Sequence, residues 1–333
     1  QRYEEALECY RAAAVVTGAD VWHWYNLGNV LALLGRYDEA LPALQKAIEA
    51  NPHHARSWAR YGNVLRQSKR LEEALAAYER ATKLDPEYAW AWNEQGITLE
   101  ALKRYDDALN AYTLASRAAP DDALYIFGQA DVLISMEQYG EALELLERSL
   151  KLDNKNARTW AKLGQVLRRL DRSADALRAY TRAVELDPEY AWAWNGRGLT
   201  LAAFGRHEEA LDCFRRAMEI DPQDVWYWYN QGDALVALGH FRAASEVLEH
   251  AVKLNANHPE SWAKLGQAYR RLDRQAEALA AYDHALALNP NYAWAWNGRG
   301  LALEALGRRE EAHVSYERAL AEDGSVIWYY TNM

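Results

Sequence analysis

The sequence predicts an all-α solenoid of 34-residue helical hairpins, and three observations support this fold class. The hexapeptide Tyr-Ala-Trp-Ala-Trp-Asn occurs three times, beginning at Tyr88, Tyr190 and Tyr292, 102 residues apart. Apolar residues within each period recur at helical spacing. A period of this length indicates stacked repeats rather than separate globular domains. Glycines also recur every 34 residues, with one doubled gap at Ala130: Gly28, Gly62, Gly96, Gly164, Gly198, Gly232, Gly266 and Gly300.

Each unit is expected to contain two helices. In the unit that begins at Val21, Trp24, Leu27, Gly28 and Leu31 occupy positions 4, 7, 8 and 11, which share one face of a first helix. Small residues at positions 8, 20 and 27 allow close helix packing, and a Pro or Asn near position 32 ends the second helix. Short polar or glycine-containing runs mark the loop between the two helices. The nine complete units begin at Val21, Ala55, Ala89, Ala123, Ala157, Ala191, Val225, Pro259 and Ala293.

The whole chain is expected to form a single array. Residues 1–20 match a second helix alone, residues 21–326 hold the nine complete units, and residues 327–333 open a further first helix. Because natural arrays end in polar capping units, we expect a fragment of a longer chain. The unit at Ala123 carries Leu124 and Ile126 where other units carry tryptophan, Ala130 for Gly and Asn154 for Pro. We expect its packing to be the least regular.

Three kinds of unit alternate, and this alternation explains the 102-residue period. One kind, at Val21 and Val225, reads Val-Trp-x-Trp-Tyr-Asn. A second has a single tryptophan and a basic run, and the third carries the hexapeptide. Three units therefore form one copied module.

The recurring order Trp-x-x-Leu-Gly, then Ala-x-x-x-aromatic, then Pro resembles the tetratricopeptide repeat family over essentially the whole chain. The resemblance implies a right-handed superhelix whose first helices line a concave face. In that family the concave face usually holds an extended peptide or a helix of a partner protein.

Composition restricts the classes of function. The chain has 38 Lys and Arg against 48 Asp and Glu, a net charge of −10 that disfavours nonspecific binding to nucleic acid or anionic membranes. Its two cysteines, Cys9 and Cys213, are far apart in the array and are not expected to pair. There is no apolar run of about 20 residues and no signal-peptide pattern. These features predict a soluble, cytoplasmic protein.

All fourteen tryptophans fall at position 2 or position 4 of a unit. Position 4 shares the face of the packed glycine and leucine, so those eight tryptophans are expected in the core. Position 2 lies about 200° away around the helix. Its tryptophans either pack between neighbouring units or line a groove, and the resemblance favours the groove. The candidates are Trp22, Trp90, Trp192, Trp226 and Trp294.

Basic and amide residues lie on the same predicted face as these tryptophans. The basic residues either bind a partner or form a solvated face with acidic partners inside the chain. Asparagines at positions 5 and 6 can hold a peptide backbone through two-way hydrogen bonds. The basic candidates are Arg56, Arg66, Arg158, Lys162, Arg168, Arg169, Lys264, Arg270 and Arg271, and the amides are Asn26, Asn93, Asn195, Asn230 and Asn297.

No catalytic motif, cofactor motif or metal-ligand spacing is present in the sequence, so we expect no enzyme, no cofactor and no metal. The predicted function is a protein-interaction scaffold, the recognition or sensor segment of a larger protein, binding a peptide or protein with acidic and apolar or aromatic side chains. One alternative is homotypic head-to-tail assembly through the open half-units at the two ends. Another is a groove for single-stranded nucleic acid, because interleaved Arg and Trp can bind phosphates and stack bases.

Overall fold

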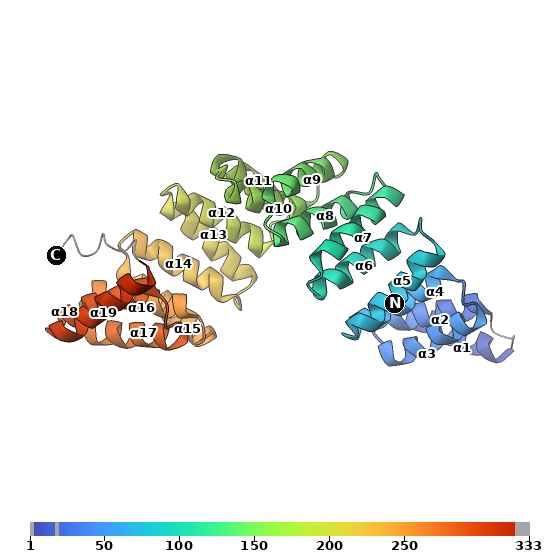
Figure 1. Cartoon of the computed structure of the whole chain (residues 1–333), viewed down its shortest axis with the longest axis horizontal. Coiled ribbons are helices and arrows are strands. Elements are labelled where there is room, and N and C mark those ends of the chain that lie inside the picture. Colours follow the sequence, from blue (N-terminus) through green and yellow to red (C-terminus); the bar gives the residue numbers. More distant parts are fainter. Residues whose placement is uncertain (1–2, 17–19, 324–333) are drawn as a thin grey trace. The chain divides into compact units, whose positions relative to one another are not determined.

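The computed structural model describes residues 3–16 and 20–323, and every regular element in these ranges is an α-helix. The chain separates into two compact units, residues 1–170 and residues 171–333. Figure 1 shows that consecutive helices within each unit pair as antiparallel hairpins. The all-α array of helical hairpins is therefore confirmed. The right-handed sense of a superhelix, and a single array over the whole chain, stay predictions.

The unit of residues 1–170 begins with a second helix that packs against the first complete hairpin. The first helices α2, α4, α6 and α8 each contact their own second helix, and consecutive members of the series α2, α4, α6, α8 and α10 contact one another. The helices are α1 (Tyr3–Val16), α2 (Val21–Leu33), α3 (Tyr37–Ala50), α4 (Ala55–Gln67), α5 (Leu71–Leu84), α6 (Ala89–Ala101), α7 (Tyr105–Ala118), α8 (Ala123–Ser135), α9 (Tyr139–Leu152) and α10 (Ala157–Arg169).

The unit of residues 171–333 follows the same pattern, and its first helices α12, α14, α16 and α18 contact one another in series. Its helices are α11 (Ser173–Leu186), α12 (Ala191–Ala203), α13 (His207–Ile220), α14 (Val225–Ala237), α15 (Phe241–Leu254), α16 (Pro259–Arg271), α17 (Gln275–Leu288), α18 (Ala293–Ala305) and α19 (Arg309–Glu322). Residues 327–333, the expected start of a further helix, lie outside the described residues.

In seven of the described hairpins, one large side chain of the second helix packs on the glycine at position 8 of the first helix. A Cβ atom added to Gly198 would lie 2.5 Å from Cε1 of Phe214, and one added to Gly28 would lie 2.5 Å from Cγ of Leu44. Both distances are shorter than any real contact, so only glycine lets the two helices approach this closely. The predicted roles of positions 8 and 24 are confirmed.

The position-4 tryptophans differ from expectation because none of the eight is fully buried. In most of them the indole Nε1–H donates to a backbone carbonyl in the loop before the helix; for example, Trp194 donates to the Pro188 oxygen at 2.9 Å. An indole N–H needs a partner when it is enclosed, and the loop carbonyl lies at the rim of the hairpin. These tryptophans therefore fasten each first helix to the preceding loop rather than filling the centre of the core.

The unit at Ala123 is well buried without the tryptophan and glycine of other units. Ile126 is fully buried in place of tryptophan, and α8 is buried continuously over residues 125–130. Gly128 at position 6 approaches the preceding hairpin, because a Cβ on it would lie 2.6 Å from the Tyr112 ring. Gln129 donates to the Ser116 hydroxyl at 2.8 Å. That this unit packs least regularly stays a prediction.

Two further expectations concern membranes and cysteines. No helix among the described residues is long and apolar enough to cross a membrane. Cys9 is exposed and Cys213 is buried, and both are free thiols.

Candidate functional site

Trp22 stands at the rim of an aromatic cluster between two consecutive first helices. It is 48% exposed. Its ring meets Tyr25 edge to face at a centroid distance of 6.1 Å and His54 at 4.7 Å. Tyr25 also meets His54, at 5.6 Å. Because His54 directly precedes α4, the cluster joins α2 to the start of α4 and leaves one large aromatic surface open to solvent.

The same cluster recurs 204 residues later in the other unit. Trp226 is also 48% exposed. Its ring meets Tyr229 at 5.8 Å and His258 at 4.5 Å, and Tyr229 meets His258 at 5.6 Å. Two copies with the same geometry show that the exposure of the outer tryptophan is a property of this kind of unit. We call these two groups the aromatic–histidine clusters.

A middle copy lies between them in the sequence. Leu124 stands 102 residues after Trp22 and 102 before Trp226, and it is 55% exposed. Phe127 takes the tyrosine position beneath it, and the Arg158 guanidinium lies over the Phe127 ring at 5.3 Å. The middle copy is therefore aliphatic and cationic instead of aromatic.

The middle copy borders a cleft of about 310 Å³ on α6, α8 and α10. Ile97, Leu124 and Phe127 supply apolar walls, and Arg158 lines one side. The lining also includes three carboxylates, Glu94, Glu100 and Asp131. An elongated side chain from a partner could enter this cleft and meet both apolar and charged groups.

Two of the cleft carboxylates already have strong partners within the chain. Asp131 pairs with the Lys162 ammonium at 2.5 Å and with Arg158 at 3.8 Å. Glu100 accepts a hydrogen bond from the Tyr112 hydroxyl. Burial raises the pKa of Glu100, and the hydrogen bond from Tyr112 partly opposes this rise.

Glu94 is the most enclosed carboxylate of the cleft. It accepts from Arg66 at 2.8 Å and from the Asn63 amide at 3.1 Å, with only 10% of its side chain exposed. A buried carboxylate needs such partners because its desolvation is costly. Arg66 is consequently engaged inside the chain.

The histidines of the aromatic–histidine clusters are held neutral at the helix starts. Nδ1 of His258 lies 2.7 Å from the Ser261 hydroxyl and accepts from the Ser261 backbone N–H at 3.3 Å. Burial lowers the pKa of His258, although Glu260 at 3.4 Å and Asp224 favour the charged form. Burial, and then the charge of Arg56, lower the pKa of His54 as well.

The other position-2 tryptophans are half-buried rather than open. Trp192 stacks on Tyr190 at a centroid distance of 6.0 Å and meets Tyr180 at 6.2 Å. Trp294 lies at equivalent distances from its own two tyrosines and beneath the Lys264 ammonium, 4.6 Å from the ring centroid. Trp90 lies under Arg60 at 5.2 Å. Position 2 therefore divides by kind of unit: its tryptophan is exposed at Trp22 and Trp226 and is half-buried against neighbouring side chains at Trp90, Trp192 and Trp294.

Much of the predicted basic face is neutralised within the chain. Arg66 pairs with Glu94, Lys162 with Asp131, and Lys264 with Asp233 at 2.7 Å. Each of these carboxylates lies on a neighbouring first helix. Of the two alternatives for the basic residues, the structure shows acidic partners inside the chain at these three positions. Arg56 is exposed beside His54.

The basic pairs near the ends of the first helices divide between two environments. Arg169 is exposed and lies 6.0 Å from the Tyr139 ring, and Arg271 lies 4.7 Å from the Phe241 ring. Tyr139 and Phe241 are each the first residue of the second helix in the preceding hairpin. Position 13 therefore lies against that second helix, and the expectation that it shares the face of the position-2 tryptophans is wrong. Arg168 and Arg270 are half-buried.

The asparagines are less accessible than predicted. Asn93, Asn195, Asn230 and Asn297 are all buried, with 4–9% exposure. The Asn230 amide donates to the Asn195 side-chain oxygen at 2.8 Å, joining α14 to α12. Only Asn26, which is half-buried, keeps some access to solvent. Their burial argues against the prediction that Asn195, Asn230 and Asn297 face a peptide, whereas Asn93 lines the cleft on α6, α8 and α10.

Sequence reasoning missed Leu124, His54 and His258. A signal was present, because the 102-residue period places Leu124 in register with Trp22 and Trp226. The histidines occupy the residue before their units, and their spacing matches no metal-ligand or catalytic pattern. Their contacts with the ring of a different unit could not be read from spacing alone.

Within residues 3–16 and 20–323, no group of three His, Cys, Asp or Glu side chains is placed to hold a metal ion.

Models of the tetratricopeptide repeat match residues 1–55, 25–89, 62–123, 161–225 and 229–293, with further models over 122–189 and 281–314. The chain belongs to the tetratricopeptide repeat family. No curated protein matches its sequence significantly. These repeats and the helical-hairpin array together support a protein-interaction scaffold in general terms.

Several solved structures are similar to this tetratricopeptide repeat chain. PilF of Pseudomonas aeruginosa is 20% identical, with a TM-score of 0.57 over 70% of this chain and 100% of PilF, and it shares the fold. YrrB, described as a tetratricopeptide repeat protein with an unusual peptide-binding site, is 29% identical over 54% of this chain and 93% of its own, with a TM-score of 0.46. MamA is 25% identical over 50% of this chain and 98% of its own, with a TM-score of 0.45.

Proposed function

We propose that each compact unit of this tetratricopeptide repeat chain binds an extended segment of a partner protein along its first helices. Apolar or aromatic partner side chains are seated on Trp22 and Leu124 in the unit of residues 1–170, and on Trp226 in the unit of residues 171–333. The observation that carries the proposal is the repeated, half-exposed tryptophan of the aromatic–histidine clusters. A large apolar surface held open by the same neighbours in two copies is typical of a binding anchor. The function is recognition and involves no catalytic step.

Charge at the rim of two of these positions favours acidic partner residues. Arg56 is exposed beside the Trp22 cluster, and Arg158 is exposed beside Leu124. Arg158 is held only loosely by Asp131, at 3.8 Å. A carboxylate that follows an aromatic side chain in the partner can therefore reach a guanidinium at either place. The basic residues that already pair within the chain, such as Lys264, contribute less.

A selection of random peptides on the intact chain tests the proposal. Wild type is expected to enrich peptides that combine aromatic or long apolar residues with Asp or Glu. Trp22→Ala and Trp226→Ala should each weaken a selected peptide about tenfold or more, the range for removing an interface anchor. Leu288→Ala is the matched control, because Leu288 is an exposed apolar residue of the second helix α17.

Two outcomes would contradict the proposal. One is a set of selected peptides that bind the double variant Trp22→Ala and Trp226→Ala as tightly as wild type. The other is equal weakening by Leu288→Ala, which would indicate nonspecific apolar adhesion. Sedimentation of the free chain and titration with single-stranded oligonucleotides test the alternatives of homotypic assembly and nucleic-acid binding.

A further inference from the structure

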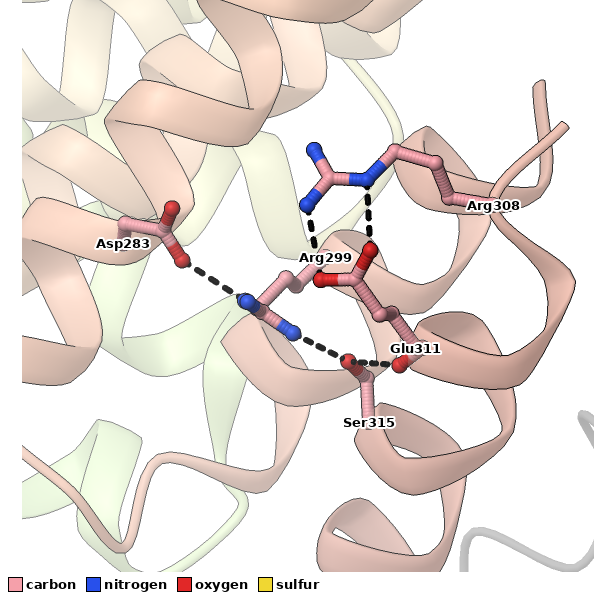
Figure 2. A network of polar contacts seen from close by, with 5 residues as sticks. All are labelled: Asp283, Arg299, Arg308, Glu311 and Ser315. Atoms are coloured by element: carbon pink, nitrogen blue, oxygen red, sulfur yellow. Dashed lines mark hydrogen bonds and ion pairs between the residues drawn. The ribbon is translucent and has the colours of Figure 1, made fainter. Parts of the chain in front are cut away.

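Arg299 on α18 is the centre of a polar network that Figure 2 shows between three helices. Its Nε–H donates to Asp283 on α17 at 2.6 Å, and its Nη1–H donates to the Ser315 hydroxyl on α19 at 2.7 Å. The guanidinium also lies over the Trp296 ring, 5.7 Å from its centroid. The positive charge of Arg299 is therefore neutralised by the Asp283 carboxylate on the preceding second helix.

Arg197 occupies the equivalent position 102 residues earlier, on α12. Its guanidinium lies over the Trp194 ring at 5.5 Å, so the aromatic support is the same. The residues at the positions of the two hydrogen-bonding partners differ between the two modules. Thr181 stands where Asp283 stands in the later module, and Cys213 stands where Ser315 stands. Neither replacement supplies an anion, since burial raises the pKa of the Cys213 thiol and keeps it protonated.

Arg197 lies in a cleft of about 490 Å³ formed by α11, α12 and the loop before α13. Its Nε is enclosed and has no hydrogen-bond acceptor among the residues that the structure describes. An enclosed guanidinium N–H without an acceptor loses hydration and gains nothing in return. The cleft therefore offers an enclosed guanidinium donor at the place where the later module has the Asp283 carboxylate.

The other arginines of this cleft are exposed, and each pairs with a carboxylate. Arg178, Arg182 and Arg206 each pair with an acidic residue three positions away on the same helix or at its start: Asp175, Glu185 and Glu209 respectively. Exposed pairs of this type are weak and exchange easily with solvent. Arginine side chains released from such pairs can turn toward a bound anion beside Arg197.

Besides Glu185, which lines the cleft, Glu209 is an acidic residue that responds to the charge of Arg197. Its pKa is lowered first by the hydrogen bond from Arg206 and more weakly by the charge of Arg197. Both of its oxygens accept from Arg206, at 2.6 and 2.7 Å. In the later module Glu311 is bound in the same way by Arg308, at 2.7 Å for both bonds, while Arg299 still takes Asp283 (Figure 2). Glu209 therefore does not replace the carboxylate that Arg197 lacks at the position of Asp283.

We propose that the cleft around Arg197 is a binding site for a carboxylate of an acidic partner segment, which takes the position that Asp283 fills inside the later module. The site lies on α11 and α12, apart from the aromatic–histidine clusters, and it is independent of the function proposed above. Planar, bidentate recognition by a guanidinium suits a carboxylate. A phosphate shares part of this chemistry, so the test distinguishes the two.

The test uses a fluorescent hexapeptide of alternating Asp and Glu, with binding to the intact chain followed by anisotropy at low salt. Arg197→Gln should weaken binding about tenfold or more, the effect of losing a charged hydrogen bond. Thr181→Asp should weaken it to a similar extent, because it supplies the carboxylate from within. Asp283→Thr should add a second site at Arg299 and raise the stoichiometry. Arg242→Gln, at an exposed arginine of α15, is the matched control and should bind as wild type.

Each contrary result overturns the proposal. These results are no saturable binding by wild type, binding by Arg197→Gln or Thr181→Asp that is as tight as that of wild type, or weakening by Arg242→Gln that equals the weakening by Arg197→Gln. Inorganic phosphate is titrated against the bound peptide. Displacement that depends on Arg197 and is tighter for phosphate than for the peptide itself would replace the carboxylate by a phosphate group as the ligand. Circular dichroism of each variant verifies that the helices are retained.

Discussion

The side-chain amide of Asn230 donates a hydrogen bond of 2.8 Å to the side-chain oxygen of Asn195, and both residues are buried. The two asparagines belong to consecutive first helices, α14 and α12. Their bond satisfies polar groups that cannot reach water easily, so it links neighbouring hairpins and sets their register. The amides thereby serve the array rather than a ligand.

Asn230→Ala should destabilise the contact between α12 and α14 by about 1–3 kcal/mol, because it leaves the Asn195 oxygen buried without its donor. The double variant Asn195→Ala and Asn230→Ala should cost less than the two single changes added together. Native-state hydrogen exchange measures both, since repeat arrays unfold in parts. Additive effects of the two single variants would show that the asparagines act independently.

Trp194 and Trp226 should differ strongly in their contribution to stability. Trp194→Ala removes a half-buried ring and its hydrogen bond to the Pro188 oxygen, and should cost about 3 kcal/mol. Trp226→Ala removes a 48% exposed ring and should cost about 1 kcal/mol. Trp194→Phe retains most of the packing and isolates the hydrogen bond, at about 1 kcal/mol. Equal losses in urea unfolding for the two alanine variants would contradict this assignment.

Two glycines in helices should respond in opposite ways to alanine. A Cβ at Gly198 meets Phe214 at 2.5 Å, so Gly198→Ala should cost about 1–3 kcal/mol by overpacking. Gly140, near the start of α9, has no atom within 4 Å of a Cβ, so Gly140→Ala should stabilise by about 0.5–1 kcal/mol. Thermal melting of both variants gives the sign directly. A loss of stability in Gly140→Ala would mean that the backbone there is strained.

The hairpin architecture could be predicted because its determinants are local and repeated. The glycine at position 8 and the large residue at position 24 recur in register, and the structure joins them as expected, as for Gly198 and Phe214. Loop glycines were equally informative, since Gly35 and Gly205 both adopt a φ of +72°. Where Lys69 replaces such a glycine, with a φ of +63°, the loop keeps the same backbone conformation.

The candidate site was harder to predict because it depends on which side chains meet between units. Spacing alone puts Arg66 and Lys162 on an open face, but the acidic groups that neutralise them lie on neighbouring first helices, 28 and 31 residues away in the sequence. Helical periodicity locates a face and does not report what the next helix presents to it. The contact between Trp22 and His54 could not be predicted for the same reason, because the two residues belong to different units.

The stability of the Trp226 cluster should fall in mild acid. Burial lowers the pKa of His258 below its ordinary value of 6.5, so protonation favours the unfolded state. The stabilising contribution of neutral His258 is complete above pH 6.5 and is lost as the pH falls below that value, toward the lowered pKa of the folded state. Hydrogen exchange of α14 and α16 at pH about 7.5 and about 5.5 measures the loss.

His258→Asn separates this titration from the capping role of the residue. Asn156 occupies the equivalent position 102 residues earlier, and its side chain accepts from the Thr159 backbone N–H at 3.1 Å. The variant should therefore retain the start of α16 while removing the dependence on pH in this part of the chain. The contacts around His54, whose pKa is also lowered, should keep their sensitivity in the same sample. An unchanged pH dependence of α14 and α16 in His258→Asn would assign the effect to another group.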